Sequence, residues 1–127
     1  MFVRYQACRP NRHGAYPGVF GLVNGLALGG NLNEMELAAW RDGNDWFNAA
    51  YPDPSKSVPG IYDPELNPQA AAWFKDTATH LIERVEPYLE MLRQHNVEFR
   101  QLVSNDPGII VYEDSVQVVV VPYKNEY

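Results

Sequence analysis

The chain has 127 residues, which is close to the usual size of one folded domain and too short for two ordinary ones. Its hydrophobic fraction of 46% and aromatic fraction of 13% are typical of a folded protein and exclude a disordered chain. The net charge of −6 opposes binding to phosphate backbones, so a nucleic-acid partner is disfavoured. We therefore predict a single domain that spans residues 1–127.

The cysteine content and the lengths of the apolar runs predict the cellular location of the protein. Cys8 is the only cysteine, so no disulfide bond can form within the chain and a site with several thiolate ligands is excluded. The first residues, MFVRYQACRP, lack the apolar stretch of a secretory signal. The longest aliphatic run, residues 118–121, is too short to span a membrane. These features predict a cytoplasmic protein with no membrane partner.

The first third of the chain predicts one strand and two helices. The alternation of residues 2–7 is typical of a strand with one buried face. Residues 18–28 are apolar and predict a helix that the glycine pair at 29 and 30 ends. Asn33 can cap a second helix that reaches about Ala50, with Glu34 and Glu36 in its first turn.

A third helix is predicted from Asn67 as its cap and Pro68 as its first residue. Apolar residues then follow at alternating steps of four and three, which indicates one buried face. They are Phe74, Ala78, Leu81, Val85, Tyr88 and Leu92. Pro87 predicts a kink or break in this helix near Val85. A short second helix would then begin at Pro87.

The last third of the chain predicts three strands. Residues 97–103 alternate, residues 105–108 form a turn, and residues 109–112 and 116–121 form a hairpin. The last strand is apolar on both faces, so it should be central. Residues 2–7 would complete the sheet if they paired beside it, although no sequence pattern indicates that pairing. The fold class is therefore α+β: a mostly antiparallel four-stranded sheet, built from the N-terminal strand plus three C-terminal strands, with about three helices on one face.

Residues 51–68 form a long connection that contains five prolines. Long loops in small domains are commonly functional, and fixed proline dihedrals lower the entropy cost of holding one shape. We expect this Pro-rich loop to be ordered by its apolar residues Tyr51, Ile61, Tyr62 and Leu66. The three tryptophans lie on its two flanks, at Trp40, Trp46 and Trp73.

The leading hypothesis is a small cytosolic binding or regulatory protein that presents this loop to a protein or small-molecule ligand. Aromatic anchors on a stiff loop suit binding, because little entropy is lost. The expected contact residues are Trp40, Asn44, Trp46, Tyr51 and Tyr62. The alternative is that the tryptophans form a hydrophobic cluster that holds the loop in place.

Two further hypotheses remain open besides the binding protein. None of the three hypotheses predicts a cofactor or a metal. The chain could be a small enzyme that acts on a nucleotide-like or nucleic-acid substrate, although it lacks the GxxxxGKS, HExxH, GxSxG and CxxC motifs. Its candidate catalytic residues are Arg4, Arg12, His13, His80 and Glu113. Arg4 and Glu113 would meet if their strands were adjacent. The third hypothesis is a homo-oligomer that associates through a sheet edge.

Overall fold

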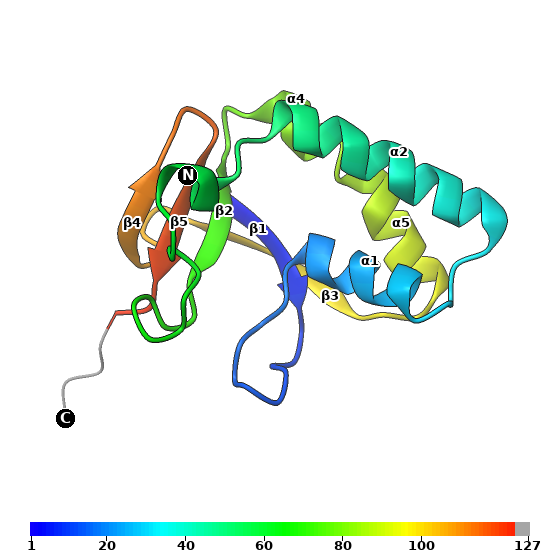
Figure 1. The fold of residues 1–127 in the computed structure, drawn as a ribbon, viewed down its shortest axis with the longest axis horizontal. Helices are drawn as coiled ribbons and strands as arrows, with labels where there is room; N and C mark the ends of the chain where they lie inside the picture. Colours follow the sequence, from blue (N-terminus) through cyan, green and yellow to red (C-terminus); the bar gives the residue numbers. More distant parts are fainter. Residues whose placement is uncertain (124–127) are drawn as a thin grey trace. The chain divides into compact units, whose positions relative to one another are not determined.

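The computed structural model describes residues 1–123, which fold into two compact units (Figure 1). The sheet unit comprises Met1–Arg4, Asp53–Ala78 and the described part of Val103–Tyr127. The helical unit comprises Tyr5–Pro52 and Thr79–Leu102. That the chain is a single domain stays a prediction.

The described residues form one five-stranded antiparallel sheet in the order β3-β1-β2-β5-β4, which confirms the α+β class. Both β1 and β3 contribute residues to each unit. The strands are β1 (Phe2–Ala7), β2 (Ala71–Lys75), β3 (Phe99–Ser104), β4 (Ile109–Glu113) and β5 (Gln117–Val121). The sheet therefore has one strand more than the sequence predicted.

The additional strand is β2, which lies where the third helix was expected to begin. Trp73 and Phe74 are adjacent in sequence and are both buried, which is typical of a strand that is covered on both faces. In β2, Trp73 lies opposite Val118 of β5. The cap prediction at Asn67 is also wrong, because no helix begins directly after this residue. Its side-chain amide instead donates to the Ile61 carbonyl at 2.9 Å.

The position of β2 changes the neighbours of the N-terminal strand. β1 pairs with β2, with Phe2 opposite Lys75 and Val3 opposite Phe74. The arrangement in which β1 lies directly beside the last strand, β5, is therefore wrong, because β2 lies between them. The expectation for the last strand is confirmed, because β5 has neighbours on both sides and its first four residues are buried.

The first two helices of the helical unit have the predicted ends. Helix α1 (Val19–Leu28) ends where Gly30 adopts a φ of +74° and the Asn31 amide donates to the Leu26 carbonyl at 3.0 Å. Helix α2 (Glu34–Ala50) begins with a capping box. The Asn33 side chain accepts from the Glu36 amide at 2.8 Å, and the Glu36 carboxylate accepts from the Asn33 amide at 3.0 Å.

Two helices remain from the segment that was predicted as a single long one. Helix α4 (Thr79–Glu83) is short, and α5 (Glu86–Gln94) carries Pro87 in its first turn, as predicted. The six apolar residues of the helical pattern are all buried, although Phe74 lies in a strand and not in a helix. Helices α1, α2 and α5 pack together. That helices cover one face of the sheet stays a prediction.

Candidate functional site

The Pro-rich loop of the sheet unit is held by its own hydrogen bonds. Helix α3 (Pro54–Ser57) is capped by Asp53, whose carboxylate accepts from the Ser55 amide at 2.9 Å. The Asp63 carbonyl then accepts from the Asn67 amide at 2.8 Å. Ile61 is only 1% exposed and anchors the loop in the core of the sheet unit. The backbone between residues 53 and 67 is therefore fixed by several independent contacts.

The same loop presents apolar side chains to solvent. Val58 is 40% exposed, Tyr62 is 44% exposed and Leu66 is 67% exposed. Of the loop's expected apolar anchors, Ile61 alone is buried, and Tyr62 and Leu66 form part of the surface. Desolvation raises the pKa of Tyr62, and the charges of Asp53 and Tyr112 raise it further, whereas Arg4 lowers it. Tyr62 therefore lies close to β4, the strand that carries Tyr112.

Trp40 and Asn44, two of the expected contact residues, belong to a chain of hydrogen bonds inside the helical unit. The Trp40 indole Nε1 donates to Asn24 Oδ1 at 2.9 Å, and Asn44 Nδ2 donates to the same oxygen at 3.4 Å. The Tyr88 hydroxyl donates to Asn44 Oδ1 at 2.6 Å, and burial raises the pKa of Tyr88 to about 12. This chain connects α1, α2 and α5, so it stabilises their packing.

The remaining expected contact residues also have packing partners. The Arg84 guanidinium lies 4.5 Å from the centre of the Trp46 ring, which is half-buried. Tyr51 lies against Phe47 at a ring-centre distance of 6.3 Å. In the sheet unit, Trp73 is only 8% exposed. Within each unit, the tryptophans therefore contribute to packing, but Trp40 and Trp46 belong to the helical unit and Trp73 to the sheet unit. That they form one cluster that holds the loop stays a prediction.

The candidate catalytic residues are divided between the units. In the sheet unit, Arg4 Nη1 donates to the Ala72 carbonyl at 2.9 Å, whereas the Glu113 carboxylate lies 2.6 Å from Lys75 Nζ. Arg4 and Glu113 lie on strands that β2 and β5 separate, so the expectation that they meet across adjacent strands is wrong.

In the helical unit, two of the candidate catalytic residues are neighbours in space. Arg12 Nε lies 3.4 Å from His13 Nε2, and both side chains are exposed. His80 is exposed on α4. The sequence favours a partly buried, hydrogen-bonded structural role for His80, next to the buried face of a helix. The exposure of its side chain contradicts that prediction.

Asp114 organises a hydrogen-bonded cluster in the β4–β5 hairpin that was not among the predicted site residues. One carboxylate oxygen accepts from the amides of Val116 and Gln117, at 2.8 and 3.0 Å. The other accepts from the Tyr112 hydroxyl at 2.7 Å and from Gln117 Nε2 at 2.9 Å. The sequence does place an aspartate in a hairpin turn, where such side chains commonly accept hydrogen bonds from backbone amides, and this position could have indicated the cluster. This carboxylate is saturated with donors, so it has a structural role.

The Asp114 cluster makes the stability of the sheet unit sensitive to acid. Burial alone would raise the pKa of Asp114, but the hydrogen bonds outweigh it and leave the pKa below its ordinary value of 3.8. A depressed pKa stabilises the folded state above the unfolded-state pKa, and this stability is lost as the pH falls through the folded-state pKa. We expect the free energy of unfolding in urea to decrease between about pH 5 and about pH 2, and Asp114→Asn to flatten this decrease.

The control for this measurement is Asp42→Asn, which removes an exposed carboxylate on α2. An acid dependence that is equally steep in Asp114→Asn and in the wild-type protein would contradict the role of Asp114.

Residues 1–123 contain no group of three or more His, Cys, Asp or Glu side chains placed to hold a metal ion. Over the same described range, no helix is both long enough and apolar enough to cross a membrane. Comparisons of the chain with protein-family models, curated proteins and solved structures found no match. The function is therefore inferred from the geometry of the chain's own residues.

Proposed function

We propose that this chain is a small binding protein that contacts a protein partner through the Pro-rich loop and the neighbouring edge strand β4. The observation that supports this proposal is the distribution of exposed large apolar side chains among the described residues. Three of them belong to the helical unit: Tyr16, Leu28 and Met35. Eight belong to the sheet unit: Met1, Val58, Tyr62, Leu66, Val103, Ile109, Ile110 and Tyr123.

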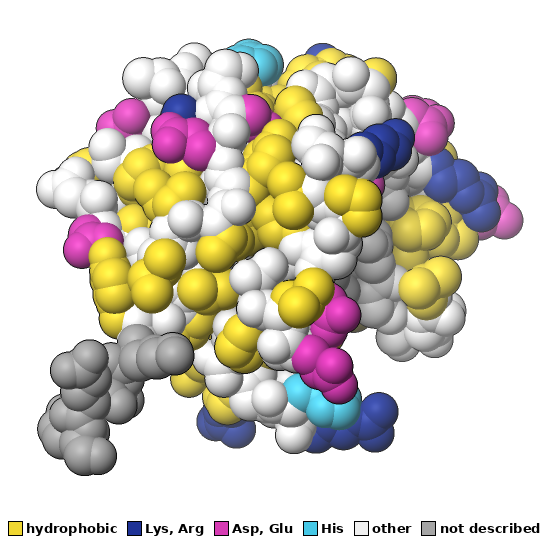
Figure 2. Space-filling view, turned by 60° about the vertical axis from the view of Figure 1, so that its left-hand side comes forward, with side chains coloured by type: hydrophobic (Ala, Val, Ile, Leu, Met, Phe, Trp, Pro, Cys, Tyr) yellow, Lys and Arg dark blue, Asp and Glu magenta, His cyan; other side chains and the backbone are white. Residues whose placement is uncertain are grey.

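An exposed apolar surface of this kind favours a protein as the ligand. Ile109 and Ile110 are each 45% exposed on β4, which is the strand at one edge of the sheet. Figure 2 shows hydrophobic side chains gathered in several groups on the face that it brings forward. Clustered apolar side chains on a monomer commonly mark an interaction site. An aromatic residue on a fixed loop also binds at low entropy cost.

Tyr62 is the side chain that we expect to contribute most to partner binding. It is the aromatic residue on the fixed loop, and its neighbour Ile61 is buried, so the ring is held at the surface. Replacing Tyr62 by alanine should weaken partner binding about tenfold or more, because aromatic hot spots contribute over 1 kcal/mol. The fold should be retained, since Tyr62 is not part of the core.

The partner can be identified with a photo-crosslinking amino acid at position 62 in the source cells. The control carries the same amino acid at position 28, because Leu28 is 82% exposed in the helical unit. Any species captured only from position 62 is then purified and titrated with wild-type, Tyr62→Ala and Leu28→Ala proteins. The proposal requires weaker binding by Tyr62→Ala alone. Equal affinity of all three proteins would contradict it.

The alternative, a small enzyme that acts on a nucleotide-like or nucleic-acid substrate, has less support. The contact between Arg12 and His13 favours it, since an imidazole beside a cation can serve in proton transfer. However, Glu113 is engaged with Lys75, and its strand is not adjacent to that of Arg4. The geometry therefore supports binding more than it supports turnover.

A further inference from the structure

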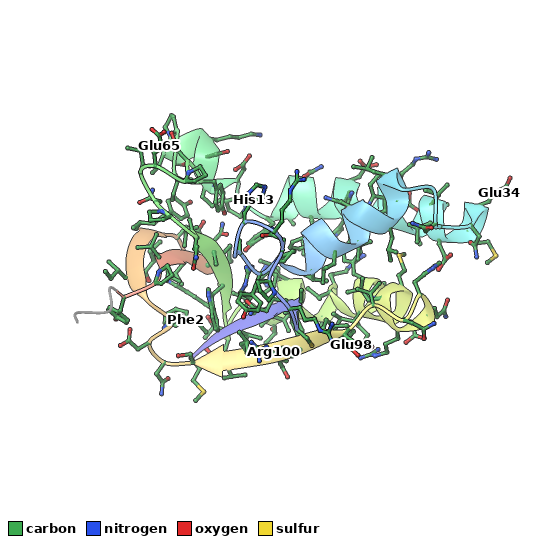
Figure 3. All side chains as sticks on the ribbon, turned by 90° about the horizontal axis from the view of Figure 1, so that it is seen from below. Phe2, His13, Glu34, Glu65, Glu98 and Arg100 are labelled. Carbon is green, nitrogen blue, oxygen red and sulfur yellow. The ribbon has the colours of Figure 1, made fainter. Side chains whose placement is uncertain are left out.

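Residues 8–18, which we call the basic loop, form a closed and internally bonded loop of the helical unit. Its base is joined by the Ala7 amide, which donates to the Pro17 carbonyl at 2.8 Å. Its tip is organised by Asn11, whose side-chain oxygen accepts from the His13 amide at 2.9 Å and from the Ala15 amide at 3.1 Å. Gly14 completes this turn with a φ of +78°. Figure 3 shows His13 on this loop.

The charge of the basic loop is opposite to that of the protein. Residues 8–18 contain Arg9, Arg12 and His13 and no acidic residue, whereas the whole chain has a net charge of −6. All three basic side chains are exposed. Among residues 1–123, no carboxylate forms an ion pair with Arg9 or Arg12. The two guanidinium groups are therefore available to an anion from solution.

Arg93 of the same unit shows the contrast. Its guanidinium lies 2.7 Å from Glu86 and 3.2 Å from Glu90, so intramolecular carboxylates already satisfy it. Within residues 1–123, Arg9 and Arg12 have no such carboxylate partner.

The basic loop also carries an aromatic ring, which lies beside another arginine of the helical unit. Tyr16, in the same loop, is 39% exposed. The guanidinium carbon of Arg100, on β3, lies 5.8 Å from the centre of the Tyr16 ring. Arginine and tyrosine side chains in this arrangement offer planar surfaces on which a base can stack. The loop thus combines cations for a phosphate with a stacking surface for a ring.

We propose that the basic loop binds a nucleotide, with Arg9 and Arg12 contacting its phosphates and Tyr16 with Arg100 contacting its base. Arginine suits this task, because its planar guanidinium donates two parallel hydrogen bonds to phosphate oxygens. A long nucleic acid is a poorer match, since its affinity needs many neutralised phosphates and the acidic remainder of the chain repels it. This site is independent of the protein-binding function proposed for the sheet unit.

The test uses the full chain labelled with ¹⁵N and three separate probes: ADP, inorganic pyrophosphate and adenosine. ADP should shift the amide resonances of residues 8–18 and of Arg100, and should bind more tightly than either fragment. Arg12→Ala should weaken ADP binding about tenfold, as expected for the loss of one charge-assisted hydrogen bond. Tyr16→Leu should weaken ADP binding and leave pyrophosphate binding unchanged, which separates stacking from phosphate contact.

The matched control is Arg41→Ala, which removes an exposed arginine from α2 and changes the net charge by the same amount. It should bind ADP as the wild-type protein does. The proposal would be overturned if ADP shifted no resonance of the basic loop, or if Arg41→Ala and Arg12→Ala lost equal affinity. If a thymidine decanucleotide bound far more tightly than ADP through the same residues, the proposal of a nucleotide ligand would be wrong and the ligand would be single-stranded nucleic acid.

Discussion

Replacing Trp73 by alanine is expected to lower the free energy of unfolding by about 3–5 kcal/mol. Trp73 is 8% exposed in β2, and it lies opposite Val118, which is fully buried in β5. Removing the indole therefore leaves a cavity that the paired strands cannot close without losing their register. Urea unfolding followed by far-UV circular dichroism measures the change without depending on tryptophan fluorescence.

Trp46→Ala is the matched comparison, because Trp46 is half-buried and packs against the Arg84 guanidinium at 4.5 Å. We expect a smaller loss of about 1–2 kcal/mol, since part of the ring already contacts water. A larger loss in Trp46→Ala than in Trp73→Ala would show that the assignment of Trp73 to the core of the sheet unit is wrong.

The second large effect is expected at Gly43, in the middle of α2. A Cβ atom at this position would lie 2.6 Å from the Tyr88 hydroxyl oxygen and 3.0 Å from the ring carbon that bears it. Alanine normally stabilises a helix by up to about 1 kcal/mol over glycine. Here the clash with a buried tyrosine should reverse the sign, so that Gly43→Ala destabilises the protein by about 1–3 kcal/mol.

Gly25→Ala in α1 is the control for this prediction, because a Cβ atom there would meet nothing within 4 Å. We expect it to stabilise the protein slightly. Tyr88→Phe removes the atom nearest to the added methyl group, so the double variant with Gly43→Ala should be less destabilised than the sum of the single variants. Simple additivity, or stabilisation by Gly43→Ala, would contradict the close approach of Tyr88 to α2.

The elements that could be predicted are those whose signals are local. The capping box of Asn33 and Glu36, the glycines after α1 and the proline at the start of α5 each act within a few residues. β2 could not be predicted in the same way, because its conformation depends on pairing with β1 and β5, which are distant in sequence. Phe74 and Ala78 are four residues apart, a spacing typical of a helix, so the pattern predicted a helix where β2 lies.

The candidate site shows the same division. The prolines and aromatic residues identified residues 51–68, but composition could not indicate that Ile61 is buried while Tyr62 and Leu66 are exposed. The hydrogen-bond partners of Trp40 and Asn44 could not be predicted from the sequence either, because Asn24 and Tyr88 come from other helices. The basic residues at 9, 12 and 13 were visible in the sequence, whereas the contact of Arg100 with Tyr16 was not.

Native mass spectrometry of the protein isolated gently from its source cells tests the proposed binding function most directly. The bare chain has a mass of 14.4 kDa. We predict an added protein-sized mass on the wild-type chain and on Leu28→Ala, and its loss from the double variant Tyr62→Ala/Leu66→Ala. The same complex in the double variant, or a bare chain in the wild-type sample at every protein concentration, would contradict the assignment of the Pro-rich loop as the contact surface.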